Sequence, residues 1–411
     1  MRVFDVLKER GYVYQATDEA KIKQMLNKEK VTFYLGIDPT ADSLHIGHFF
    51  ALTMVRRMQE YGHRAIIIIG GATALIGDPS GKSQMRNILT KEEVALNKKE
   101  VENLVKRFVY TTGDNPAIIL DNADWINHES YIDFLRKIGI HFNVNKMLAT
   151  DCYKKRLEEG GLTFLEMGYM LMQAYDFVYL NREYGCKLQI GGSDQWANIV
   201  AGVDLGRKLD NLDGRKVDRL FGLTCPLLVK ADGEKMGKTE SGTLWVSREK
   251  TTVYDFYQVF RNAFDEDVER LLAFFTDLEM TYIKDLCQKD IVKAKKIMAY
   301  EITKLVHGSD EADQVAAASA KIFTEGMSDN MPTVEIQKQQ LENLDIMALL
   351  KLVDLVSSKS EAKRLIEQGG IKLNQAKVTS IDRMIKEDDF KDNTMILQKG
   401  KKVYLKVILK G

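Results

Sequence analysis

The stretch that decides the fold is Tyr34-Leu-Gly-Ile-Asp-Pro-Thr-Ala-Asp-Ser-Leu-His-Ile-Gly-His48. It leaves a predicted strand, turns at Asp38-Pro39, and enters a predicted helix whose N-cap we expect to be Asp42 or Ser43. The N-terminus of this helix then faces the carboxyl end of the strand. Unpaired backbone N–H groups and the helix dipole favour phosphate groups at such a position. The stretch therefore predicts a phosphate-handling site beside a strand.

The alternation of strand and helix continues to about residue 221. Short strands are predicted at 31–36, 65–70 and 187–192, each ending at glycines and each followed by a helical stretch. The apolar run at 65–69 is typical of a strand buried on both faces. This pattern predicts an α/β domain with a parallel sheet covered by helices, and ligands bind at the carboxyl ends of such strands.

The rest of the chain has a different character. Apolar residues three and four apart predict helices over 251–324, and the breakers at 326–333 predict a flexible connection. Residues 347–411 hold 14 Lys and Arg against 8 Asp and Glu, a net charge of +6, although the whole chain is neutral. A basic tail of this kind is either an ordinary solvated surface or a surface for a polyanionic partner.

Composition and length exclude several classes of protein. The chain has 411 residues, 45% of them hydrophobic and 29% charged, which favours two or three soluble globular domains. No signal-peptide core and no apolar run of about 18 residues occurs, so we expect neither secretion nor membrane spanning. The cysteines form no CxxC pair, which favours a reducing cytoplasm over a zinc site or a disulfide framework. They are Cys152, Cys186, Cys225 and Cys287.

Two pairs of basic side chains are candidates for phosphate chemistry. His45 and His48 share a face of the first helical turn, and Gly47 between them would leave room for a nucleotide. Such a pair taken alone is more often solvated or structural, and it could also hold a metal. Lys235 and Lys238 lie far downstream in a glycine-punctuated loop, which taken alone is usually a solvated turn.

Taken together, the two pairs resemble a known family. His45-Ile-Gly-His48 and Lys235-Met-Gly-Lys-Thr239 resemble the two signatures of class I aminoacyl-tRNA ligases. The second departs from the usual Lys-Met-Ser-Lys-Ser at Gly237 and Thr239. Four further stretches resemble the bacterial-type, tyrosine-specific branch of that family, and they lie at 34–40, 70–80, 169–176 and 189–196.

The resemblance covers nearly the whole chain and implies its architecture. We expect a Rossmann-like α/β catalytic domain, a helical domain, and a small α+β RNA-binding domain similar to the S4 module. The expected segments are a catalytic nucleotide-binding domain at 1–222, a mobile signature loop at 223–250, a helical domain at 251–327, a linker at 328–343 and the S4-like domain at 344–411.

The resemblance also implies an amino-acid site. The phenol hydroxyl of a tyrosine substrate would meet Tyr34 and Asp176, and further tyrosine-binding residues would be Asp78, Tyr169, Gln173 and Gln195. Tyr169, Gln173 and Asp176 recur at spacings of four and three, so one helix face can present all three. Without the signatures, Tyr169 is better explained as a half-buried core aromatic and Asp176 as a surface charge.

The implied ATP site follows the strand ends and the downstream loop. Its residues would be Gly36, Asp38, Thr40, His45, Gly47, His48, Gly192, Asp194, Lys235 and Lys238. Catalytic donors and cations among them would be Thr40, His45, His48, Lys235 and Lys238. Asp194 could instead be an N-cap after its strand. We expect Mg²⁺ to accompany ATP, and we find no dedicated protein cage for a metal.

The implied reaction has two steps. The tyrosine carboxylate attacks the α-phosphorus of ATP and expels pyrophosphate, and the acyl group then passes to the 3′ end of tRNA(Tyr). The tail segment 358–377 is typical of a helix, a glycine turn and a strand, and its candidate RNA-binding residues are Lys359, Lys363, Arg364 and Lys372. These cations could also be ordinary solvated residues. A homodimer is expected from the family alone.

Two rival interpretations stay open at the level of sequence. A tryptophan ligase shares the class signatures, although Tyr34 with Asp176 favours a hydroxylated ring. An RNA-binding protein that kept the fold without the chemistry would not need the intact histidines and lysines.

Overall fold

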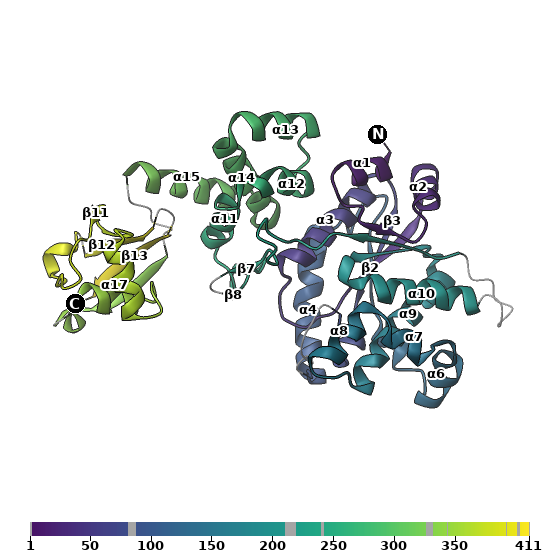
Figure 1. Cartoon of the computed structure of the whole chain (residues 1–411). Helices are drawn as coiled ribbons and strands as arrows, with labels where there is room; N and C mark the ends of the chain where they lie inside the picture. The colour runs from purple at the N-terminus through teal and green to yellow at the C-terminus, as the bar shows by residue number, and fades with distance from the viewer. Residues whose placement is uncertain are drawn as a thin grey trace. The chain divides into compact units, whose positions relative to one another are not determined.

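The computed structural model divides the chain into two compact units. One comprises Met1–Thr251 with Phe264–Ala294, and the other Thr252–Ala263 with Lys295–Gly411. The structure describes residues 2–80, 88–209, 219–239, 242–325, 332–342, 344–391, 393–400 and 403–410. Figure 1 labels the elements of both units.

A six-stranded sheet forms the centre of the first unit, in the order β1-β6-β5-β2-β3-β4. The strands are Gln15–Ala16 (β1), Thr32–Ile37 (β2), Arg64–Ile69 (β3), Ile118–Asp121 (β4), Leu188–Gly192 (β5) and Phe221–Cys225 (β6). All neighbours are parallel except β1, which pairs antiparallel with β6. The strands predicted at 31–36, 65–70 and 187–192 are therefore confirmed as β2, β3 and β5. The strand order reverses between β2 and β5, and the carboxyl ends at such a reversal form a crevice for ligands.

Helices cover this sheet on both faces, which explains why Ile66 to Ile69 are fully buried. Figure 1 shows α3 and α10 on opposite sides of β2. The helices of this unit between the strands are Val3–Glu9 (α1), Glu19–Lys28 (α2), Ile46–Glu60 (α3), Lys91–Phe108 (α4), Ala123–Ile126 (α5), Tyr131–Lys137 (α6), Val144–Leu148 (α7), Asp151–Glu159 (α8), Phe164–Tyr184 (α9) and Trp196–Leu209 (α10). Three short 3₁₀ helices join them, at Thr73–Leu75 (η1), Gly139–His141 (η2) and Ser193–Gln195 (η3).

The helix after β2 begins later than predicted. Its N-cap is His45, so the expectation of Asp42 or Ser43 was wrong. The physical reason is a backbone contact with a distant segment: the Val246 N–H donates to the Leu44 carbonyl at 2.9 Å. Residues just before the helix are held in an extended conformation by this pairing, so the helical turn cannot start earlier.

The stretch predicted to be helical over 251–324 is helical, and it is shared between the units. Asp265–Phe275 (α12) and Met280–Lys289 (α13) belong to the first unit. Val253–Arg261 (α11), Ser309–Glu325 (α15) and most of Ile291–His307 (α14) belong to the second. None of the helices that the structure describes is long and apolar enough to cross a membrane. All four cysteines carry free thiols.

The tail of the second unit is a small α+β fold with its own core. Its sheet has the order β11-β10-β12-β13-β9. The strands are Thr333–Gln337 (β9), Ile371–Leu373 (β10), Ala376–Lys377 (β11), Thr394–Lys399 (β12) and Val403–Lys410 (β13), and the helices are Ile346–Leu352 (α16) and Lys359–Glu367 (α17), with 3₁₀ turns at Lys338–Leu341 (η4) and Glu387–Asp389 (η5). The helix, glycine turn and strand predicted for 358–377 are confirmed. Buried apolar residues from Ile336 to Leu409 pack into one cluster that holds these elements together.

Candidate active site

A buried phenol and a buried carboxylate lie at the heart of the first unit. Tyr34 of β2 is 1% exposed, and its hydroxyl has no hydrogen-bond partner among the described residues. Asp176 of α9 is also buried and accepts hydrogen bonds from Asn122 Nδ2 at 3.1 Å and Trp125 Nε1 at 2.8 Å. Burial raises the pKa of Asp176 to about 8 in spite of these two donors. The hydroxyl of Tyr34 thus retains a hydrogen bond to offer to a ligand.

Gln189 is a third polar group in this region and was not among the residues singled out from sequence. It is the direct partner of Tyr34 in the parallel pairing of β2 with β5, so both side chains leave the same face of the sheet. Gln189 is 2% exposed, and its Oε1 has no partner within the part of the chain that the structure describes. The polar residue inside a buried strand was the available signal, but the strand register that joins it to Tyr34 is visible only in the structure.

A chain of hydrogen bonds links the two ends of the candidate amino-acid site. The Tyr169 hydroxyl donates to Asp38 Oδ2 at 2.8 Å, and Thr73 Oγ1 donates to Asp38 Oδ1 at 2.7 Å. Asn122 Nδ2 then reaches both Thr73 Oγ1, at 3.0 Å, and Asp176. The carboxylate of Asp38, expected along the nucleotide, is therefore joined to Tyr169, which was predicted to bind the tyrosine substrate. The network fixes the orientation of both acidic side chains.

The carboxylate of Asp78 forms a second polar group near α9. It is 5% exposed, accepts from Gln195 Nε2 at 2.6 Å, and is oriented by the Ser80 N–H at 2.9 Å. Gln173 of α9 has a buried Oε1 without a partner among the described residues. The structure thus joins Asp78 directly to Gln195, as expected of residues that share one site.

The histidine signature forms the first turn of α3. His45 Nδ1 accepts from the N–H groups of Gly47 at 3.0 Å and His48 at 3.2 Å, so its remaining proton is assigned to Nε2. The two imidazoles stack with their centroids 3.7 Å apart. A Cβ on Gly47 would lie 2.9 Å from His45 Cε1. The glycine therefore makes room for the capping imidazole of His45, and the space that it would leave for a nucleotide stays a prediction.

The lysine signature is joined to this helix through its backbone. The Leu244 N–H donates to the Gly237 carbonyl at 2.6 Å, and the Ile46 N–H donates to the Leu244 carbonyl at 3.1 Å. Gly237 has a φ of +94°, and a Cβ there would meet Ile46 Cγ2 at 2.6 Å. Lys235 is exposed, and Lys238 begins the short strand Lys238–Thr239 (β7), which pairs with Gly242–Thr243 (β8). The two signatures are far apart in sequence, but these backbone hydrogen bonds bring them next to each other in the fold.

The remaining predicted ATP residues lie at strand ends or in the turn after β2. Gly36 is exposed near the end of β2, with open space where a Cβ would be. The Thr40 N–H donates to the Asp38 carbonyl at 2.8 Å, which closes the turn after β2. Gly192 ends β5, and a Cβ on it would lie 2.7 Å from Asp194 Oδ1. The Asp194 carboxylate therefore lies close to the strand end, and it would have to shift to admit a Cβ there.

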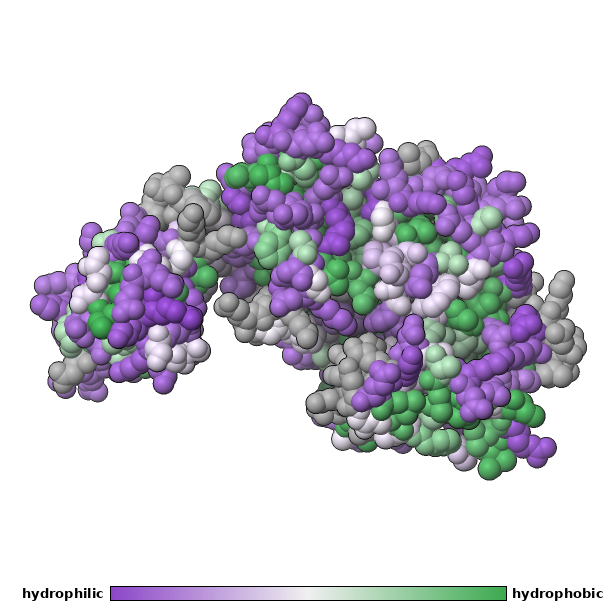
Figure 2. All heavy atoms as spheres, in the orientation of Figure 1, coloured by the Kyte–Doolittle hydropathy of each residue, from purple (hydrophilic) through white to green (hydrophobic). Residues whose placement is uncertain are grey.

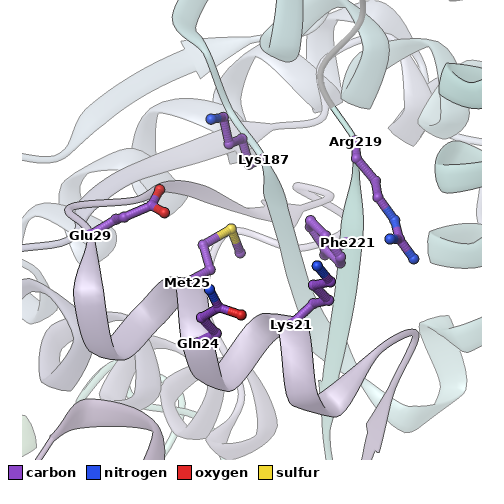
Figure 3. A pocket seen from close by; sticks show the side chains of 7 residues that line it. All are labelled: Lys21, Gln24, Met25, Glu29, Lys187, Arg219 and Phe221. Atoms are coloured by element: carbon purple, nitrogen blue, oxygen red, sulfur yellow. The ribbon is translucent and has the colours of Figure 1, made fainter.

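A surface pocket lies at the opposite edge of the same sheet (Figure 3). It is lined by Lys21, Gln24, Met25, Glu29, Lys187, Arg219 and Phe221. Lys187 directly precedes β5 and Arg219 lies just before β6, so the pocket opens at the amino ends of these strands. Because the signatures lie at the carboxyl ends, this pocket is no part of the candidate active site.

Comparison with known proteins places this arrangement in a family. Residues 26–324 match the family described as tRNA synthetases class I (W and Y). The chain belongs to that family. Residues 323–407 of this class I synthetase match the tyrosine–tRNA ligase SYY-like C-terminal domain.

Individual relatives agree over the full length of this class I synthetase. The tyrosine–tRNA ligase of Clostridium tetani is 48% identical over 411 residues, with 99% of each chain covered. That of Acetivibrio thermocellus is 48% identical over 412 residues, again with 99% of each chain covered. The solved structure of a C-terminally truncated mitochondrial tyrosyl-tRNA synthetase from Aspergillus nidulans has a TM-score of 0.69 at 28% identity, covering 78% of this chain and 94% of its own.

The tail of this class I synthetase presents the predicted basic residues outward. Lys359, Lys363 and Arg364 of α17 are exposed, whereas Ala362 and Ile366 on the other face of the helix are buried. Lys372, partly buried in β10, follows the glycine turn. All four residues belong to two neighbouring elements of one small fold, α17 and β10.

Proposed function

We propose that this class I synthetase is a tyrosine–tRNA ligase, which activates L-tyrosine with ATP and transfers it to the 3′ end of tRNA(Tyr). The observation that carries the proposal is the buried pair Tyr34 and Asp176: Tyr34 packs in an apolar cluster, and burial together with the nearby Asp176 carboxylate raises the pKa of its hydroxyl. A tyrosine hydroxyl can donate to one and accept from the other. The indole of tryptophan or the ring of phenylalanine would leave buried polar atoms unpaired, at a large cost in binding.

The amino-acid site is completed by groups at the other end of α9. We assign the substrate ammonium to Asp78, Tyr169 and Gln173, since carboxylate, hydroxyl and amide oxygens are suitable acceptors for it. Gln195, which donates to Asp78 at 2.6 Å, orients that carboxylate and lies beside the reacting carboxylate of the substrate. Tyrosine would then lie along α9, with its phenol end buried and its carboxylate toward the strand ends.

ATP is assigned to the carboxyl ends of the strands and to both signatures. Gly36, Asp38 and Thr40 lie on one side, and Gly192 and Asp194 on the other. The Nε2–H of His45 and the imidazole of His48 can donate to phosphate oxygens, and Lys235 and Lys238 supply positive charge as the pentavalent phosphorus forms. Mg²⁺ accompanies ATP as part of the substrate and neutralises the departing pyrophosphate.

The basic tail is assigned to tRNA. Lys359, Lys363, Arg364 and Lys372 would contact phosphates, and the tail would act as an S4-like module. The segments 1–222, 223–250, 251–327, 328–343 and 344–411 stay a prediction, and the proposed cytoplasmic location fits the four free thiols.

A homodimer is proposed from the apolar surface of the first unit. Ile132, Ile140 and Val144 are exposed by 61%, 75% and 52%, and Phe164 at the start of α9 by 72%. Figure 2 shows hydrophobic residues gathered at the surface over α6. A second copy of the chain that covered these side chains would remove them from water, which is the main driving force for association.

The proposed function is tested by exchange of labelled pyrophosphate into ATP. Exchange should depend on tyrosine and should be weaker by orders of magnitude with tryptophan or phenylalanine at the same concentration. Charging of tRNA(Tyr) with tyrosine should follow in the complete reaction. Exchange that depends on tryptophan would instead establish the rival amino acid, and no exchange with any amino acid would favour an RNA-binding protein without catalysis.

A further inference from the structure

The loop with Lys235 is a small antiparallel hairpin, and residues of another element bind the backbone at its base. Val229 and Lys235 form a bridge, the Met236 N–H donates to the Leu228 carbonyl at 2.7 Å, and the Lys230 N–H donates to the Glu234 carbonyl at 2.7 Å. The hairpin projects toward solvent, because Lys235 is exposed. Its position relative to the rest of the site is therefore set by the contacts that its first strand makes.

These contacts come from two residues of α12. Asp267 is 4% exposed, and its Oδ2 accepts from the Ala231 N–H at 3.0 Å. Arg270 donates to the Val229 carbonyl and, at 2.7 Å, to Asp267 Oδ1. Asp267 and Arg270 thus form an ion pair on α12. The pair binds the backbone of the hairpin at two points, the Ala231 N–H and the Val229 carbonyl. A buried carboxylate is stable here only because both of its oxygens are paired.

The opposite end of α12 packs on the histidine helix. Phe275 stacks on Phe49 of α3 with the ring centroids 5.6 Å apart, and Phe274 lies 4.5 Å from Phe50. All of these residues belong to the first unit. One rigid helix therefore contacts α3, which begins at His45, and the hairpin that carries Lys235.

We propose that Asp267 and Arg270 are positioning residues for adenylate formation, which hold the Lys235 hairpin at a fixed place relative to the histidine helix. The inference rests on the proposed role of Lys235 toward the ATP phosphates. A cation contributes to transition-state stabilisation only if it is held near the developing charge, and a displacement of about 1 Å can cost on the order of 100-fold in rate. Asp267 and Arg270 touch no substrate, and they act through the backbone of the loop.

The test is single-turnover formation of tyrosyl-adenylate by the full-length chain. Asp267→Asn removes the negative charge and leaves one oxygen for two donors, and we expect it to slow the step on the order of 10-fold with tyrosine affinity unchanged. Glu266→Gln is the matched control, because it removes an exposed charge from the same helical turn. Arg270→Ala is a second variant at a partly exposed position, and it should slow the step in the same way if Asp267→Asn does not fold.

A double-mutant cycle separates positioning from a general loss of structure. In a Lys235→Ala background, Asp267→Asn should slow adenylate formation by no more than about 2-fold further, because the group it positions is already gone. Multiplication of the two single effects would overturn the proposal, and so would a normal rate in both Asp267→Asn and Arg270→Ala. A normal rate in Lys235→Ala would refute the role of Lys235 itself, and with it this inference. Absence of adenylate in the unaltered chain would instead refute the proposed function.

Discussion

Burial gives single residues of the site their chemistry. Asp176 and Tyr34 are ordinary side chains whose pKa values are both raised because water is excluded from them. The Tyr34 hydroxyl carries an unused hydrogen bond, and Asp176 stays coupled to Asn122 and Trp125. If the substrate phenol binds here as proposed, this pocket would recognise it by hydrogen bonds that an unhydroxylated ring cannot replace.

Replacing Tyr34 with phenylalanine separates binding from stability. Tyr34→Phe should weaken tyrosine binding by about 1 kcal/mol and narrow the preference for tyrosine over phenylalanine, because one neutral hydrogen bond is lost. The free energy of unfolding should not fall, since the hydroxyl has no partner within the described part of the unliganded chain. Equilibrium binding and urea unfolding would measure the two quantities, and unchanged selectivity would contradict the assignment of Tyr34.

The raised pKa of Asp176 predicts a stability that depends on pH. The folded chain holds this proton up to about pH 8, whereas the unfolded chain releases it near the ordinary value of 3.8. Between these pKa values the folded state binds more protons, so the contribution to stability is complete at low pH and is lost as pH rises. Asp176→Asn should therefore gain stability relative to the unaltered chain as pH rises, by at most about 1.4 kcal/mol per unit.

Urea unfolding at pH 5, 6.5 and 8 would measure this slope. A constant offset between the two chains is expected, because an asparagine offers one oxygen to the two donors Asn122 and Trp125. The diagnostic quantity is the change of the difference with pH. A difference that stays constant from pH 5 to 8 would show that the carboxylate ionises as easily in the folded chain as in the unfolded one.

Among the elements, two helices hold the segment that carries the lysine signature. The hairpin is bonded to α12 at its base, and its continuation lies against the start of α3 through Gly237. The usual signature has serine at this position, and a serine Cβ at 2.6 Å from Ile46 would force the backbone away from α3. Glycine therefore brings the loop closer to the histidine helix in this chain.

Two glycines of the loop form a matched pair for a test of this close approach. Gly237→Ala places a side chain at a positive φ and also brings its Cβ into contact with Ile46. Gly233→Ala places a side chain at a similar φ of +85°, but its Cβ would have no atom within 4 Å. We expect Gly237→Ala to slow adenylate formation on the order of 10-fold and Gly233→Ala to leave it nearly unchanged. Equal effects of the two substitutions on the single-turnover rate would show that backbone strain alone matters.

For the molecule as a whole, the tail is a part of the second unit that has an apolar core and a net charge of its own. Its apolar cluster is formed by residues from Ile336 to Leu409, and outside this cluster Ile396 packs against Tyr254 of α11. The net charge of +6 over 347–411 balances an acidic remainder of the chain. A separate basic fold suits a step that involves RNA and leaves amino-acid activation to the first unit.

Truncation separates the two steps of the reaction. A chain that ends at Glu325, the last residue of α15, should form tyrosyl-adenylate at nearly the normal rate and lose most transfer to tRNA. The affinity of the complete chain for tRNA should fall steeply with salt, because each phosphate contact releases counterions, and the slope should be shallower for the truncated chain. Equal transfer by the two chains would remove the tail from the RNA-binding step.

The parallel sheet, the helical stretch and the small basic fold could all be predicted from the amino-acid sequence. This was possible because β2, β3 and β5 are short apolar runs that end at glycines, and because local periodicity follows from the geometry of strands and helices. The signatures pointed to His45, His48 and Lys235, and the resemblance to the tyrosine-specific branch pointed to Tyr169 and Asp176, which the spacing on α9 places on one helix face.

Only the tertiary structure decided contacts between residues that are distant in sequence. The predicted N-cap was wrong because Leu44 pairs with Val246, which lies far downstream in the sequence. Gln189 was missed because its nearness to Tyr34 depends on strand register, and Asp38 was given to ATP alone because its bond to Tyr169 spans 131 residues. The hydrogen bond between the lysine hairpin and Asp267 could not be predicted for the same reason. Contacts between distant parts of the fold leave no local pattern in the sequence.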